Sequence, residues 1–462
     1  MADSAGIGGE ALGLARSLIA GLDEIRNALP PPPGGVGQRL REHLREDPRR
    51  LPGVVERFPL SDRVNLQLAL NEVEAGSDRW QLIGLQADVG NFGGFSITAL
   101  AGGRFGMHID EQPVEHTQLP FDVDATLDCF RSGLILTEHD DVPVGILVFT
   151  QQHGPQPDLI VEIVAAADGV ASELLGRIKR LMREKNVYRG KVVSFSFGHH
   201  GEFGLRFAHV PTLTRSDVIM PATDLEAIED HTLVMSSHAD ALRAAGQHLR
   251  RGLLLYGPPG TGKTHTVMYL CNQLHGRTVI LLAGPALHAI GQAGSLAREL
   301  APAMIVIEDV DLIGMDRGLP GGEHNPLLFQ LLNEMDGIGD DTDVIFLLTT
   351  NRIDLLEPAL AARPGRVDRA VEIGLPDGDA RRRLLRLYLP DDAVLTEDTM
   401  GQVIQRTEGA AAAFVKELAR RTVLVQLTHG TPFDAAIERA LDEMLEHAPP
   451  ILRRSLGVAV DD

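Results

Sequence analysis

Residues 252–264 read Gly-Leu-Leu-Leu-Tyr-Gly-Pro-Pro-Gly-Thr-Gly-Lys-Thr, a short apolar run followed by a glycine-rich loop. The run predicts a buried strand, and the loop predicts a turn into a helix. Gly257, Gly260 and Gly262 permit a backbone whose N–H groups surround a phosphate, at a helix N-terminus that favours negative charge. Lys263 would reach the outer phosphates, and the Thr264 hydroxyl would bind Mg²⁺. The stretch therefore predicts a nucleoside triphosphate site with its metal ion.

Composition limits what surrounds this loop. The chain has 462 residues, of which 44% are hydrophobic, so two or three globular domains are expected. Its net charge of −21 argues against a chain built mainly to hold nucleic acid, because duplex affinity comes largely from Lys and Arg that neutralise phosphates. Two cysteines, Cys129 and Cys271, indicate no disulfide framework. Neither a membrane span nor a secretory signal is visible, so we expect a soluble, cytoplasmic protein.

The first half of the sequence predicts an arm and a domain. Residues 1–35 predict a helix ended by four consecutive prolines, which would pack on the chain's own next domain or on another subunit or adaptor. Residues 36–211 predict an α+β domain with strands near 144–150, 159–165 and 191–197 and a helix over 168–186. The basic residues of that helix are interpreted as a solvated face, and His199 and His200 as a surface turn rather than a metal site. No catalytic group is recognised in this domain.

The second half alternates strand and helix, which predicts an α/β fold with a parallel sheet covered on both faces. We expect this sheet domain over residues 212–376 and a helical subdomain with a tail over 377–462. The five apolar runs that predict its strands are 253–256, 279–282, 304–307, 344–348 and 370–373. Since ligands of such sheets lie beyond the carboxyl ends of the strands, the residues after each run are the candidates for chemistry.

Acidic and amide side chains follow two of these runs. Glu308, Asp309 and Asp311 come after the third run, where one carboxylate can support Mg²⁺ and its neighbour can orient the attacking water. Asn351 follows the fourth run and could hydrogen-bond the γ-phosphate or that water. A cluster of arginines at 363–369 precedes the fifth run. Arginine supplied to a phosphoryl-transfer site neutralises the charge that develops there.

Together these residues make the chain resemble the AAA clade of the AAA+ ATPases across about residues 215–445. The resemblance rests on the loop at 257–264, the acids at 308–309, the segment Leu331–Gly337, Thr349–Asn351 and the region 357–376. It implies ATP and Mg²⁺ as ligands and a homo-oligomeric ring, most often a hexamer, with ATP bound between protomers. A helical lid would begin after Pro376.

The resemblance also implies residue roles. Thr264 and Glu308 would support the metal, Asp309 would position water and Asn351 would be sensor 1. Arg363 and Arg366 would be arginine fingers that point into the neighbour's site. Tyr388 falls where the family often places an adenine contact, and Ala412 with Ala413 at the sensor 2 position. The expected nucleotide-binding residues are Gly257, Pro258, Pro259, Gly260, Thr261, Gly262, Lys263, Thr264, His265, Tyr388, Ala412 and Ala413.

Two departures from the family pattern affect the expected function. Most relatives have Asp then Glu at the strand end, whereas Glu308 precedes Asp309 here, as in a subgroup similar to the mitochondrial translocase of folded Rieske protein. The water-positioning carboxylate is then one methylene shorter, which could slow hydrolysis. In the expected axial pore loop, residues 287–291, Ala289 stands where relatives that thread unfolded chains commonly have an aromatic residue. A glycine-rich stretch at 318–322 suggests a flexible second loop instead.

These features predict an Mg²⁺-dependent ATPase ring that remodels, assembles or disassembles a protein client recruited by the N-terminal domain. An alternative is an assembly scaffold that is gated by nucleotide and hydrolyses little. A nucleic-acid motor is a weaker alternative, because the chain is acidic and shows no basic groove lined with aromatic residues.

Overall fold

The structure is a computed structural model, and it describes residues 35–87, 96–102, 109–152, 157–197, 203–311, 326–339, 341–354 and 366–447. The predicted arm over residues 1–35 lies outside these ranges except for its last residue. The chain divides into two compact units. The N-terminal unit comprises residues up to 187 together with 198–204, and the C-terminal unit comprises 188–197 and the residues from 205 onward.

The N-terminal unit is built on a six-stranded sheet in the order β1-β8-β7-β6-β2-β3, and each neighbouring pair is antiparallel. Strands β4 and β5 form a separate hairpin. The strands are β1 (Gly53–Pro59), β2 (Trp80–Ala87), β3 (Ile109–Gln112), β4 (His116–Asp122), β5 (Ala125–Phe130), β6 (Gly133–His139), β7 (Val142–Gln152) and β8 (Pro157–Ala165). The helices are α2 (Val36–Leu44), η1 (Pro48–Arg50), η2 (Leu60–Asp62), α3 (Arg63–Ala75), α4 (Ile97–Gly102) and α5 (Val170–Glu184).

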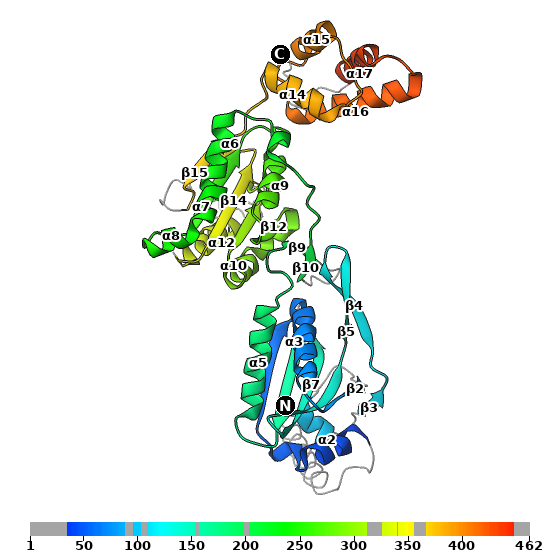
Figure 1. The fold of residues 1–462 in the computed structure, drawn as a ribbon, viewed down its shortest axis with the longest axis vertical. Coiled ribbons are helices and arrows are strands. Elements are labelled where there is room, and N and C mark those ends of the chain that lie inside the picture. Colours follow the sequence, from blue (N-terminus) through cyan, green and yellow to red (C-terminus); the bar gives the residue numbers. More distant parts are fainter. Residues whose placement is uncertain are drawn as a thin grey trace, which may run out of the picture. The chain divides into compact units, whose positions relative to one another are not determined.

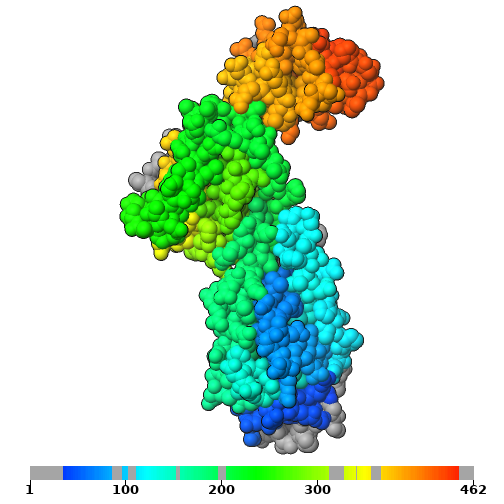
Figure 2. All heavy atoms as spheres, viewed as in Figure 1, coloured from blue at the N-terminus to red at the C-terminus, as the bar shows by residue number. Residues whose placement is uncertain are grey.

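Helices cover both faces of this sheet, because its central strands are apolar on both sides. On β7, Ile146 and Val148 pack in one buried cluster with α3 and α5, while Leu147 and Phe149 pack in another with α2 and α4. This alternation is the period of two that an extended strand imposes. Figures 1 and 2 show α3 and α5 lying side by side over one face. The prediction of an α+β N-terminal domain is confirmed.

The C-terminal unit contains a seven-stranded sheet in the order β10-β9-β12-β13-β14-β11-β15 (Figure 1). The pairings β9·β12, β12·β13, β13·β14, β14·β11 and β11·β15 are all parallel. The strands are β9 (Val192–Phe197), β10 (Phe203–Phe207), β11 (Arg251–Tyr256), β12 (Thr278–Leu282), β13 (Ala303–Ile307), β14 (Val344–Thr350) and β15 (Arg369–Glu372). All five predicted strands of the α/β sheet are therefore present.

One strand lies in a different sheet from the one predicted. The run 191–197, assigned from the sequence to the N-terminal domain, forms β9 and pairs with β12, with Val193 opposite Ile280. Val193 is fully buried there. The assignment to the N-terminal domain is wrong because the apolar pattern of a strand does not specify which sheet it joins.

Helices flank the parallel sheet as predicted for an α/β fold. Residues of α6 and α9 share a buried cluster with Leu253, Val306 and Leu347, and α10 packs on β12, β13 and α12. These elements are η3 (Arg215–Asp217), α6 (Ala222–Glu229), η4 (Asp230–Val234), α7 (Met235–Ser237), α8 (Ala239–Ala244), α9 (Lys263–Gln273), η5 (Gly284–Ala289), α10 (Ile290–Glu299) and α12 (Pro326–Gly337).

The C-terminal helical region is also confirmed. It consists of α14 (Gly378–Tyr388), α15 (Glu397–Arg406), α16 (Ala412–His429) and α17 (Phe433–His447), coloured orange to red in Figure 1. These four helices enclose a core of their own that includes Leu385, Phe414 and Leu441. Within the described ranges, no helix has the length and apolar character that crossing a bilayer requires.

The expected pore loop is not an exposed loop in this structure. Residues 287–291 span the end of η5 and the start of α10. Ala289 is fully buried and Leu287 nearly so, whereas His288 is exposed. The role of this segment as a pore loop stays a prediction; within the single chain the segment folds against the sheet domain, with Ala289 buried. The predicted second loop, 318–322, lies outside the described residues.

Candidate functional site

The glycine-rich loop joins β11 to α9 and has the backbone that the sequence predicts. Its three glycines have positive φ angles, 144° at Gly257, 76° at Gly260 and 113° at Gly262. A side chain at Gly257 is excluded as well, since a Cβ there would lie 2.3 Å from the carbonyl oxygen of Ile373. The loop therefore ends at the N-terminus of α9 in a conformation that L-residues with side chains rarely adopt.

Lys263 lies beneath this loop rather than in solvent. The residue is 6% exposed, and its Nζ donates hydrogen bonds to the carbonyl oxygens of Gly257 (2.9 Å) and Pro258 (2.8 Å). Burial lowers the pKa of Lys263, while Asp309 and Asp311 oppose that shift by stabilising the ammonium. The ammonium is thus held beside the place where phosphates would enter.

Thr264 and Glu308, the two residues predicted to support Mg²⁺, are brought together. Glu308 directly follows β13, and the Thr264 hydroxyl hydrogen-bonds to its carboxylate. Burial raises the pKa of Glu308 and the nearby Asp309 charge adds to the increase, whereas the bond from Thr264 opposes it. Among the described residues, nothing hydrogen-bonds to Glu308 Oε1, although that atom is buried. A buried oxygen without a partner beside a hydroxyl is a donor set that fits Mg²⁺, which prefers oxygen ligands.

Asp309 and Asn351 meet at the same edge of the sheet. The Asn351 side-chain amide donates to Asp309 Oδ1 at 3.1 Å, and Asp309 has a positive φ of 50°. The backbone N–H of Asp309 is bound by the Thr349 hydroxyl at 3.0 Å. The residues proposed to position water and to sense the γ-phosphate are therefore in direct contact.

Asp311 has a role in this site that the sequence did not assign to it. It is 6% exposed and accepts hydrogen bonds from the Thr350 hydroxyl (2.9 Å) and the backbone N–H of Asn351 (3.2 Å). Asp311 therefore holds the backbone of Asn351 in place through this hydrogen bond. Its position two residues after Asp309, at the end of a buried strand, was the available signal.

The lid closes one side of the site. The backbone N–H of Ala413 donates to the carbonyl oxygen of Gly260 at 2.9 Å. A cavity of about 400 Å³ lies between the loop and the lid. It is lined by Pro259, Gly260, Gly262, Lys263, Thr264, His265, Asp309, Asn351, Tyr388, Ala412, Ala413 and Lys416. Most of the residues predicted to bind nucleotide thus share one cavity.

Some residues of the cavity differ from the prediction. Gly257, Pro258 and Thr261 are not among those that line it, and Thr261 instead braces the loop by donating to the carbonyl oxygen of Pro258 at 3.0 Å. Lys416 also lines the cavity, although no sequence motif indicated this residue. Its ammonium lies 5.3 Å from the centre of the Tyr388 ring, a cation–π contact at the lid.

The two predicted arginine fingers are placed differently. Arg363 lies outside the described residues. Arg366 is 7% exposed and binds both carboxylate oxygens of Asp336 in α12, through Nε at 3.1 Å and Nη2 at 2.7 Å. Arg366 is not among the described residues that line the cavity of its own chain.

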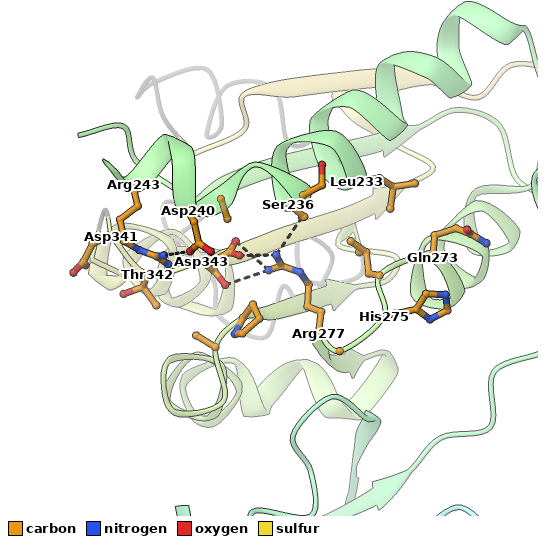
Figure 3. Close-up of a pocket in the computed structure, with 16 residues that line it drawn as sticks. Leu233, Ser236, Asp240, Arg243, Gln273, His275, Arg277, Asp341, Thr342 and Asp343 are labelled. Carbon is orange, nitrogen blue, oxygen red and sulfur yellow. Dashed lines mark hydrogen bonds and ion pairs between the residues drawn. The ribbon is translucent and has the colours of Figure 1, made fainter. Parts of the chain in front are cut away.

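A second polar cluster lies at the opposite, amino-terminal ends of the parallel strands (Figure 3). Asp343 pairs with Arg277 at 2.6 Å and with Arg251 at 3.0 Å, and both arginines donate to Ser236 Oγ. A cavity of about 570 Å³ opens beside Arg277. Within the described chain, Nε and Nη1 of Arg251 are buried without a partner. The cluster lies at the edge of the sheet opposite the phosphate loop. Its buried ion pairs therefore concern the stability of the sheet and not the nucleotide site.

Comparison with known proteins agrees with this geometry. Residues 253–375 match the family "ATPase family associated with various cellular activities (AAA)". These residues therefore form an AAA ATPase domain, a domain that binds ATP with Mg²⁺ as its usual metal.

Several curated proteins are similar to the chain over the region that includes this domain. An ATP-dependent zinc metalloprotease FtsH of Mycoplasma mobile is 32% identical over 231 residues, which are 46% of this chain and 32% of the relative. FtsH 2 of Symbiobacterium thermophilum is 32% identical, over 49% of this chain and 40% of the relative. The human ATPase family gene 2 protein homolog A is 31% identical, over 49% of this chain and 26% of the relative. The chain thus spans less than half the length of these relatives.

Both cysteines are expected to be unreactive in the folded protein. Burial raises the pKa of Cys129 to about 11 and that of Cys271, which also lies near the Glu308 charge, to about 12. Because the thiolate is the reactive form, about 0.1% or less of each thiol would be reactive at pH 8. Ellman's reagent should therefore label neither thiol within minutes in the native protein and both after unfolding. Rapid release of one equivalent from native protein would contradict the burial.

Proposed function

We propose that the chain is an Mg²⁺-dependent ATPase that works as a homo-oligomeric ring and remodels, assembles or disassembles a protein client. The observation that carries this proposal is the single cavity in which the phosphate loop, Lys263, Asp309 and Asn351 face the lid residue Tyr388. In this assignment the loop and Lys263 bind the phosphates. Mg²⁺, when bound, neutralises charge on the transferring phosphate.

Four side chains of the site would support the metal ion and the attacking water. Thr264 and Glu308 would hold the metal, because the Thr264 hydroxyl lies beside the Glu308 carboxylate, whose buried Oε1 atom has no partner in the described chain. Asp309 would orient the attacking water and take up its proton, with its carboxylate held by Asn351. Asp311 would keep Asn351 in place, so that a change at the γ-phosphate is transmitted to strand β14.

The ring part of the proposal concerns the arginines. Arg366 is not among the described residues that line the cavity of its own chain, and its guanidinium pairs with Asp336 of α12. We assign Arg363 and Arg366 to the neighbour's γ-phosphate, where a guanidinium in trans is worth about 10³- to 10⁵-fold in rate. A ring of identical subunits provides such a head-to-tail interface.

The N-terminal unit is proposed to recruit the client. Its β4–β5 hairpin carries two exposed apolar side chains near the turn, Phe121 (36% exposed) and Val123 (45% exposed). Apolar side chains of this kind supply contact area to a protein partner. The protease activity named for the FtsH relatives is not proposed for this chain, whose 462 residues contain no His-Glu-x-x-His zinc motif.

A nucleotide-gated scaffold is the second candidate, and the shorter carboxylate of Asp309 favours it. ATP turnover by the wild type beside Asp309→Asn separates the two. An ATPase requires Mg²⁺-dependent phosphate release that falls by at least about 100-fold in Asp309→Asn. Oligomerisation on ATP without phosphate release would support the scaffold, and stimulation by DNA would support a nucleic-acid motor instead.

Mixed rings test the trans arginine. Asp309→Asn and Arg366→Ala subunits should each be inactive alone, and mixing them should restore part of the turnover, because some interfaces then combine an intact acid with an intact arginine. Mixing Asp309→Asn with Lys263→Ala subunits is the matched control and should restore nothing, since both defects lie in the same half of the site. Equal activity of the two mixtures would overturn the shared site, and a monomer in ATP by light scattering would overturn the ring.

A further inference from the structure

Away from the nucleotide site, three potential metal ligands converge in the N-terminal unit. His139 ends strand β6, Asp140 is the first residue of the turn into β7, and Glu173 lies in the first turn of α5. One ligand atom from each lies within 4.8 Å of the other two. Among the described residues, these three form the group of His, Cys, Asp or Glu side chains close enough together to share a metal ion.

The three residues are held by elements that are independently well packed. His139 pairs with Val142 across the β6–β7 ladder, so the turn is limited to two residues. Glu173 is exposed, but its neighbours Ala171 and Leu174 are buried against the sheet. The three residues therefore lie where a hairpin and a helix N-terminus are both anchored to one core.

A second observation concerns the imidazole of His139 itself. The Nε2 atom of His139 is buried, and it has no hydrogen-bond partner within the described chain. Leaving a buried polar nitrogen unpaired costs about 1–3 kcal/mol. A nearby imidazole, His43, shows the usual solution, because its Nε2 lies 2.8 Å from the carbonyl oxygen of Thr137. His139 has no such contact but has two carboxylates nearby.

We propose that His139, Asp140 and Glu173 bind a divalent transition-metal ion, for which Zn²⁺ is the test ion. One imidazole nitrogen with two carboxylate oxygens is a set that suits Zn²⁺, whereas Mg²⁺ and Ca²⁺ prefer oxygen ligands alone. Two carboxylates also balance the charge of a dication. The bound ion ties the β6–β7 turn to α5, so it stabilises the N-terminal unit.

The test uses the full chain without nucleotide, titrated with Zn²⁺ by calorimetry. The variants are Glu173→Gln and His139→Gln, and the matched control is Glu184→Gln, an exposed carboxylate at the other end of α5. We expect the wild type and the control to bind one Zn²⁺ more than the two site variants do. Loss of a ligand should weaken that binding by at least about 100-fold. Since Glu173 is exposed, Glu173→Gln should retain the fold even if His139→Gln does not, which circular dichroism will show.

Two further measurements separate this site from adventitious binding. Zn²⁺ should raise the melting temperature of the wild type and of Glu184→Gln but not that of Glu173→Gln. Co²⁺ in place of Zn²⁺ should give visible absorption bands without thiolate charge transfer, because neither cysteine is a ligand. Equal Zn²⁺ affinity in wild type and Glu173→Gln, or Co²⁺ spectra with thiolate bands, would overturn the proposal. Neither result depends on ATP turnover.

Discussion

Lys263→Ala should lose ATP turnover by about 10²- to 10³-fold, because it removes a charged donor that is already positioned where phosphate charge develops. The lysine also holds the loop, since its Nζ bonds to the carbonyl oxygens of Gly257 and Pro258. ATP affinity should therefore fall together with turnover. Phosphate release and binding of a fluorescent ATP analogue measure the two effects separately.

Two variants make this result specific. Lys263→Arg keeps the charge in a longer, planar group, so it should retain part of the ATP affinity but not the turnover. Lys179→Ala removes an ammonium that pairs with Glu56 on the surface of the N-terminal unit, and it should leave both measurements unchanged. Wild-type turnover in Lys263→Ala would show that the loop is not the catalytic phosphate site.

The local sequence was sufficient to predict the site residues that directly follow a strand or form the glycine-rich loop. The glycines of the loop, the acids that end β13 and the amide that ends β14 were predicted because parallel strands bring their carboxyl ends to one edge of the sheet. The pairing of Thr264 with Glu308 follows from the same rule.

Features that depend on tertiary contacts were not predictable from these patterns. The strand β9 reads as an ordinary apolar run, and nothing in its residues specifies β12 as its partner. Arg366 and Asp336 are each visible in family-like segments, but their bidentate pair is set by how α12 packs. His139 and Glu173 are separated in the sequence by strands β7 and β8, so no spacing rule connects them. In each case the missing information is which surfaces of two elements meet.

The amino-terminal edge of the sheet supplies the second large effect. Asp343→Ala should lower the free energy of unfolding of the C-terminal unit by about 3–5 kcal/mol, because removing one partner leaves buried charge uncompensated. Asp343 is the only carboxylate paired with Arg251 and Arg277 among the described residues, and the side chains of these arginines are 0% and 5% exposed. Burial already lowers the pKa of Arg251 to about 10 even with Asp343 in place. Urea denaturation monitored by far-ultraviolet circular dichroism measures this loss of stability.

A control variant and a double-mutant cycle test whether the loss of stability comes from the unpaired arginines. Asp341→Ala removes an exposed carboxylate from the same cavity, two residues earlier, and should change stability by less than about 0.5 kcal/mol. In an Arg277→Ala background, Asp343→Ala should lower the free energy of unfolding by at least about 1 kcal/mol less than it does in the wild type. One of the two buried arginines that Asp343→Ala would leave unpaired is then already absent.

If Asp343→Ala lowered the free energy of unfolding as little as Asp341→Ala does, water would have to reach both guanidiniums. The cavity in Figure 3 is the route by which it could do so. Additive losses in the cycle would instead mean that Asp343 acts mainly through Arg251, whose remaining N–H groups have no other partner in the described chain.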